Sequence, residues 1–101
     1  MSTTFEVLAE PGRRRILDLL RDRSRAVNEL VEGTGLSQPG VSKHLKVLRE
    51  AGLVQVRPEG KLRWYGLRAE PLAEVAGWLE PYRAHWTARF EALERHLEEN
   101  P

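Results

Sequence analysis

Hydrophobic positions along the chain follow two different periods. Apolar residues cluster with helical spacing in residues 5–8, 16–20, 30–31, 41–48 and 72–97, whereas apolar and polar residues alternate in 53–57 and 62–67. Helical spacing puts apolar side chains on one face of a helix, and alternation indicates a strand with one buried face. The pattern therefore predicts a mainly α-helical chain with a small β-hairpin.

Proline and capping residues set the expected ends of the first three helices. The first helix begins near residue 3 or 4 and ends before Pro11, because the residue before a proline disfavours helical dihedral angles. Pro11 suits the first turn of the second helix. Asn28 is expected to cap the third helix, which ends in the tight turn of residues 33–35.

The fourth predicted helix has the clearest ends. Ser37 can accept from first-turn N–H groups, Pro39 costs little in that turn, and Gly52 suits the left-handed position after the helix. One face forms a buried stripe of Val41, Leu45 and Leu48. The opposite face has no large apolar group and carries Gln38, Ser42, Lys43 and Lys46.

Positive charge is concentrated in the middle of the chain, although the net charge of the whole is only +1. Residues 1–36 carry six basic and six acidic side chains, residues 37–68 seven and two, and residues 69–101 three and seven. A concentrated positive face on a near-neutral protein favours phosphate binding. The arginines at 13–15 could reach a DNA backbone, but solvation or pairing with Asp18 and Asp22 is the simpler expectation.

The surroundings of the fourth helix decide between two interpretations of its polar face. An ordinary surface helix would be merely solvated, whereas donors, acceptors and positive charge suit the DNA major groove. A short helix, a glycine-bearing turn and a second helix make a helix-turn-helix. The hairpin directly after it, with a turn expected at residues 58–61, makes a winged helix-turn-helix. Its charges, Arg57, Lys61 and Arg63, could simply prevent edge aggregation, but their position favours a DNA contact.

The last helical region carries a long apolar stripe. Pro81 lies within it and either kinks one long helix or divides the region into two helices. This much apolar surface could fold back as core, but we expect it to form a dimer seam together with the first helix. The predicted interface residues are Phe5, Leu8, Leu79, Tyr82, Trp86, Phe90, Leu93 and Leu97.

Length and composition restrict the classes of protein. A chain of 101 residues is expected to form a single winged-helix domain over residues 1–101. It has no cysteine, no apolar run long enough for a membrane span and no signal-peptide pattern at residues 1–6, so we expect a cytoplasmic protein. No Gly-rich phosphate loop, no cysteine nucleophile and no carboxylate pair in a plausible pocket suggests an enzyme, and no catalytic residue or cofactor is predicted.

Three segments resemble the ArsR family (ArsR/SmtB-type) of winged-helix repressors. Residues 36–54 closely resemble its recognition-helix signature, residues 8–17 its second-helix opening and residues 60–67 its wing. The resemblance implies a homodimer, built on the terminal helices, that binds a palindromic double-stranded DNA operator and represses transcription. The residues expected to bind DNA are Gln38, Pro39, Gly40, Ser42, Lys43, His44, Lys46, Arg57, Lys61 and Arg63.

His44 and Gly40 differ from the other residues expected to bind DNA. His44 would lie at the helix flank, where packing is a more frequent role for histidine than a phosphate contact. Gly40 departs from the larger, often hydroxyl-bearing residue expected there, which removes one base contact and leaves the operator sequence open.

The family's metal sites are not reproduced in this sequence. The thiolate site needs two cysteines on the third helix, and there are none. His85, His96 and Glu99 keep the spacing of three of the four ligands of the C-terminal zinc site, but Arg83 stands at the fourth, and a guanidinium cannot coordinate zinc. The resemblance is therefore to the non-metal subgroup, and no metal site is predicted.

Two alternative functions are a zinc-responsive repressor of the same fold and a winged helix used as a protein-interaction module. The positive segment disfavours the second, because protein interface cores are depleted in charge. The sequence leaves open the operator, the regulated genes, an unidentified small-molecule effector, and activation as against repression.

Overall fold

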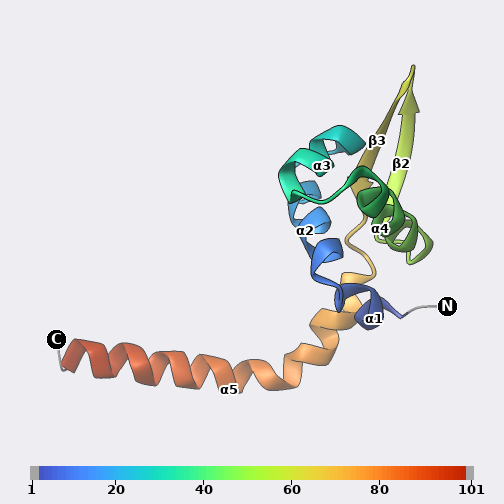
Figure 1. Cartoon of the computed structure of the whole chain (residues 1–101). Helices are drawn as coiled ribbons and strands as arrows, with labels where there is room; N and C mark the ends of the chain where they lie inside the picture. The colour runs from blue at the N-terminus through green and yellow to red at the C-terminus, as the bar shows by residue number, and fades with distance from the viewer. Residues whose placement is uncertain (1–2, 100–101) are drawn as a thin grey trace.

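The computed structural model describes residues 3–99, which form five helices and a small antiparallel sheet (Figure 1). In chain order the elements are α1 (Thr4–Leu8), α2 (Pro11–Leu20), β1 (Arg25–Ala26), α3 (Val27–Thr34), α4 (Gln38–Glu50), β2 (Val54–Glu59), β3 (Leu62–Leu67) and α5 (Leu72–Glu99). The predicted architecture, mainly helical with a winged helix-turn-helix, is confirmed.

The hydrophobic core lies where α1 to α4 meet the base of the hairpin. Its buried side chains are Val7, Ile16, Leu17, Leu20, Leu30, Val41, Leu45, Leu48, Leu53 and Val54. The predicted stripe of α4 is buried, with Val41 and Leu48 at 0% exposure and Leu45 at 2%. Burial of this stripe leaves the polar face of α4 directed away from the core.

The predicted cap of α3 is wrong. The helix begins at Val27, so Asn28 lies inside the first turn, and the N-cap is Ala26. The carboxylate of Glu29 accepts from the Ala26 N–H at 3.2 Å and from Arg23 Nη2 at 2.6 Å. These hydrogen bonds, the one from Arg23 first, lower the pKa of Glu29.

The arginines at the start of α2 also differ from the prediction. Arg13 Nε donates to the Val7 carbonyl at 2.7 Å, and Arg14 Nη1 donates to the Leu8 carbonyl at 2.6 Å. They satisfy carbonyls that the short helix α1 leaves open at its C-terminal end. These two side chains therefore join α1 to α2, instead of being only solvated or paired with Asp18 and Asp22.

The sheet has the strand order β1-β3-β2, and its hairpin turn is tighter than predicted. Pro58 and Glu59 continue β2 and pair with Arg63 and Leu62, so that only Gly60 and Lys61 form the turn. Gly60 has a φ of 61°, which a two-residue hairpin turn readily uses. Pro58 is tolerated because β2 is an edge strand.

The last helix, α5, is continuous through Pro81 and leaves the body of the protein. Figure 1 shows that it changes direction in its first half and then extends away from the other elements. Leu72, Val75 and Leu79 are half-buried, whereas Trp86 is 44% and Phe90 70% exposed. The helix therefore does not fold back as core. None of the helices within residues 3–99 has the length and apolarity of a membrane span.

Candidate nucleic-acid interface

Both ends of α4 are closed by local hydrogen bonds. At the start, Ser37 Oγ accepts from the Gly40 N–H at 3.1 Å, which confirms the predicted cap. At the end, Gly52 has a φ of 77°, and the Leu53 N–H donates to the Leu48 carbonyl at 3.0 Å. This is the arrangement of a Schellman motif, which turns the chain directly into the hairpin.

The turn before α4 is equally well defined. Gly35 ends α3 with a φ of 74°, and its N–H donates to the Val31 carbonyl at 3.0 Å. Thr34 Oγ1 donates to the Leu30 carbonyl and accepts from the Leu36 N–H. Three residues therefore connect α3 to α4, which gives the helix-turn-helix its compact geometry.

The predicted polar face of α4 is presented to solvent. Gln38, Pro39, Ser42, Lys43 and Lys46 are all exposed. Within residues 3–99 neither lysine takes part in a hydrogen bond or an ion pair, so both ammonium groups are available to a ligand. Exposed amide, hydroxyl and ammonium groups along one helix face can bind base edges and phosphates.

Gly40 has a structural role at the start of α4. A Cβ built at this position would lie 3.0 Å from Ser37 Oγ, the atom that caps the helix. The absence of a side chain therefore leaves room for the cap. Gly40 can offer a ligand its backbone only.

The wing presents two of its three predicted cations without a partner. Arg57 Nη1 lies 2.8 Å from Glu59 Oε2, so its charge is compensated within β2. Lys61 in the turn and Arg63 on β3 are exposed and have no ion pair with any residue between 3 and 99. Lys61 and Arg63 are therefore the stronger candidates for a phosphate contact.

His44 is turned towards α2 rather than towards solvent. Its Nδ1 is buried and has no hydrogen-bond partner among the described residues. Its Nε2 lies so close to Gly12 that a Cβ there would be 2.8 Å away. These contacts favour a packing role for His44 over the alternative of a phosphate contact.

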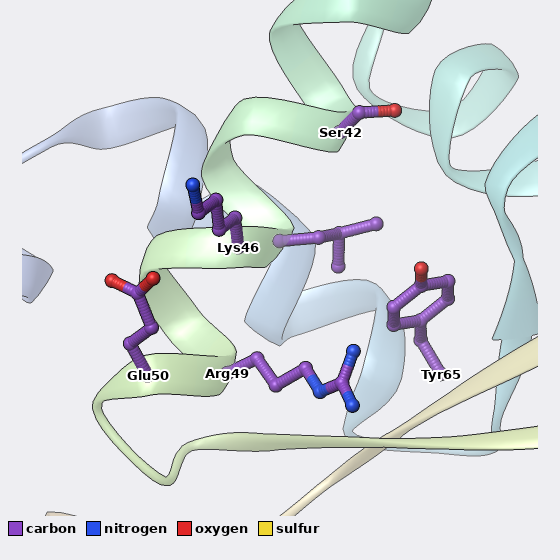
Figure 2. Close-up of a pocket in the computed structure, with 6 residues that line it drawn as sticks. Ser42, Lys46, Arg49, Glu50 and Tyr65 are labelled. Carbon is purple, nitrogen blue, oxygen red and sulfur yellow. The ribbon is translucent and has the colours of Figure 1, made fainter.

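A cleft that the sequence pattern does not predict lies beside the predicted DNA-binding face. Between α4 and the hairpin the surface is hollowed to about 430 Å³, lined by Ser42, Leu45, Lys46, Arg49, Glu50 and Tyr65 (Figure 2). Arg49 follows Ser42 and Lys46 at helical spacing, so the sequence could have indicated that these three side chains lie on one side of α4. Tyr65 enters only through the pairing of β3 beside α4, which no local pattern indicates.

The predicted dimer residues are only partly brought together within one chain. The rings of Phe5 and Trp78 meet edge to face with centroids 5.9 Å apart, and Trp78 lies 5.4 Å from Tyr82. The first helix therefore packs beside the start of α5, as expected. Further along, Trp86, Phe90, Leu93 and Leu97 are exposed.

The histidines of α5 do not gather into a metal site within the chain. Among residues 3–99, no three side chains of metal-binding type lie close enough to hold an ion. The His85 ring lies 6.5 Å from the Tyr82 ring, and Arg83 pairs with Glu80 at 3.4 Å. Arg83 thus has a surface partner on its own helix.

Comparison with known proteins defines the class of protein. The family profile described as "Bacterial regulatory protein, arsR family" matches residues 10–56. The transcriptional repressor SdpR of Bacillus subtilis is 29% identical over 78% of this chain and 88% of its own length. The regulator Rv2034 of Mycobacterium tuberculosis is 40% identical over 82% of this chain and 75% of its own. The chain spans only 63% of the length of another relative, Rv0081 of M. tuberculosis.

Solved structures agree with this class. A "possible transcriptional regulator for arsenical resistance" superposes with a TM-score of 0.73 at 38% identity, covering 81% of this chain and 85% of that one. The homodimeric winged helix-turn-helix DNA-binding domain of Mb0332 from Mycobacterium bovis gives 0.64 at 32% identity, with coverages of 77% and 72%. The fold, the family profile and these relatives together define the class as winged-helix transcriptional regulators. The chain belongs to the ArsR family.

The contact between Gly12 and His44 can be tested by a double-mutant cycle. Gly12→Ala would place a methyl group against the half-buried imidazole, and overpacking of this kind costs about 1–3 kcal/mol. In a His44→Ala background the same change should cost at least about 1 kcal/mol less. Denaturant unfolding of the four proteins measures this difference. Equal costs in both backgrounds would show that His44 does not pack against α2.

Proposed function

We propose that this protein is a homodimeric repressor that binds a palindromic DNA operator. The observation that carries the proposal is the exposed polar face of α4, which lies beside the wing. Within the described part of the chain, two lysines on this face and two cations on the wing have no ion pair. The residues proposed to bind DNA are Gln38, Pro39, Gly40, Ser42, Lys43, Lys46, Lys61 and Arg63. Arg57 acts more weakly because of Glu59, and His44 acts through packing.

The two parts of this surface have different roles in the proposal. Gln38 and Ser42 carry neutral donors and acceptors at the N-terminal half of α4, which suits base edges in the major groove. The lysines of α4 and the cations of the wing suit phosphates, which set affinity and position rather than sequence preference. Major-groove reading with flanking phosphate contacts is the usual docking of a helix-turn-helix.

The dimer part of the proposal rests on the apolar side chains that a single chain leaves uncovered. Large aromatic and aliphatic residues follow the outer length of α5, and exposed patches of this kind mark interaction sites. The similar Mb0332 domain is described as homodimeric. We therefore place the interface on α1 and α5, with Phe5, Leu8, Leu79, Tyr82, Trp86, Phe90, Leu93 and Leu97.

This assembly makes residues 1–101 one winged-helix domain with dimerising terminal helices. Two recognition helices related by a two-fold axis would read half-sites about one helical turn apart, roughly 10–12 base pairs centre to centre. SdpR, a relative, is named a transcriptional repressor, which supports repression over activation. Bacterial DNA lies in the cytoplasm, and we propose that location for the protein.

Base reading by α4 is tested with an operator selected from a random DNA pool. Gln38→Ala and Ser42→Ala should each weaken binding to the selected site by roughly 1–3 kcal/mol, because a base contact is lost. Binding to random DNA, measured by the same fluorescence anisotropy assay, should change much less. Equal losses on selected and random DNA would contradict base reading.

The wing is tested through the salt dependence of DNA affinity. Lys61→Ala and Arg63→Ala should each lower the slope of log K against log salt by about 0.9, because each removes one phosphate contact. Arg57→Ala serves as the matched comparison and should change the slope less, since Glu59 already compensates its charge. Three unchanged slopes would mean that the hairpin does not touch DNA.

The dimer is tested by placing a charge on the exposed stripe of α5. Trp86→Glu should yield monomers in sedimentation equilibrium and weaken operator binding severely, since an unpaired charge at an apolar seam is costly. Ala88→Glu adds the same charge about half a turn away on the helix and should leave the dimer intact. A folded monomer of the unmodified chain at micromolar concentration would refute the proposed assembly.

A further inference from the structure

The cleft between α4 and the hairpin combines an apolar floor with a cationic rim. Leu45, which is 2% exposed, and the half-buried ring of Tyr65 form the floor. Lys46 and Arg49 supply positive charge, and Ser42 and Tyr65 supply hydroxyl groups. Figure 2 shows the Arg49 side chain extending away from α4 towards Tyr65, while Lys46 and Glu50 point to the other side of the helix.

The polar groups of the cleft are available to a ligand. Among residues 3–99, no hydrogen bond or ion pair engages the Arg49 guanidinium, the Lys46 ammonium or the Tyr65 hydroxyl. A guanidinium presents several N–H donors in a fixed fork that matches a carboxylate or a phosphate. A free guanidinium and a free hydroxyl at the two sides of one cleft therefore favour an anionic ligand.

The size and floor of the cleft indicate what the rest of that ligand is. A volume of about 430 Å³ is in the range of small-molecule sites and is much larger than one phosphate group requires. A backbone phosphate of DNA would make no use of the buried Leu45 and the Tyr65 ring. An organic anion with an apolar body uses both the floor and the rim.

We propose that this cleft binds a small organic carboxylate with an aromatic or aliphatic body, and that this ligand and DNA exclude each other. Its carboxylate lies at Arg49 and the Tyr65 hydroxyl, and its apolar body lies on Leu45. Ser42 and Lys46 line the cleft and also belong to the proposed DNA-binding face. The exclusion therefore rests on the proposed function, whereas ligand binding itself does not.

Ligand binding is tested first, without DNA, on the full chain. The probes are naphthalene-2-carboxylate and decanoate, and naphthalene-2-carboxamide is the neutral counterpart of the first. Amide NMR titration of the ¹⁵N-labelled protein should show saturable shifts centred on residues 42–50 and 65 for a carboxylate. The carboxamide should bind about tenfold more weakly, because it lacks the charge-assisted hydrogen bonds. Equal affinities for acid and amide, shifts centred on α5, or no saturable binding of either acid would overturn the proposal.

Variants then locate the carboxylate. Arg49→Gln should weaken binding of naphthalene-2-carboxylate about tenfold and leave binding of the carboxamide unchanged. Arg21→Gln, which removes an exposed arginine at the C-cap of α2, is the matched control and should change neither affinity. If Arg49→Gln instead weakened DNA binding, lowered its salt slope and left acid binding unchanged, the cleft would be a DNA-phosphate site and the proposal would be wrong.

Competition on the selected DNA completes the test. A saturating carboxylate should lower the DNA affinity of the unmodified protein by at least tenfold, and DNA should lower carboxylate affinity by the same factor, because such coupling is reciprocal. A ternary complex with unchanged affinities would overturn the exclusion. If the protein bound no DNA at all while the carboxylate bound the cleft, the proposed function would fail and the ligand site would stand.

Discussion

Burial of one face of α4 is the constraint on which the functional surface depends. Val41, Leu45 and Leu48 are inserted into the core, and replacing one buried leucine by alanine typically costs about 2–5 kcal/mol. Because helix periodicity fixes the opposite face once this stripe is buried, Gln38 and Ser42 have to face solvent. The same leucine that anchors the helix, Leu45, forms the floor of the adjoining cleft. The orientation of α4 about its own axis therefore determines both which side chains pack in the core and which are available to a ligand.

The residues that follow α4 fix the position of the wing relative to this helix. Gly52 adopts a left-handed conformation, and the next two residues, Leu53 and Val54, are buried as the chain enters β2. The Arg68 N–H donates to the Leu53 carbonyl at 2.8 Å, so that the return strand closes on the same point. The hairpin is thus fixed at its base. Towards its tip Lys61 and Arg63 are exposed, which suits side chains that bind a DNA backbone.

The sequence predicted elements whose causes are local and missed those that depend on distant partners. Ser37, Gly52 and the α4 stripe act within one helix, and all three predictions were confirmed. Asn28 was misjudged because β1 pairs with β3 and lets α3 begin at Val27, where Glu29 reaches the cap. The inward orientation of His44 depends on Gly12, 32 positions away. Tyr65 reached the cleft through sheet pairing, which residue periodicity cannot indicate.

The exposed apolar stripe of α5, where the proposed dimer forms, is linked by side-chain contacts to α1 and α2. Phe5, Trp78 and Tyr82 form a row of aromatic contacts where α5 leaves the body, and beyond it Trp86, Phe90, Leu93 and Leu97 are exposed. Arg13 and Arg14 bind the carbonyls of α1, so that α1 is joined to α2 on one side and to α5 on the other. A second copy that covers α5 would therefore act on α2 through α1, and α2 contacts His44 on the recognition helix. In the proposed dimer, the seam and the DNA-facing helix are linked by packed side chains rather than by a flexible connection.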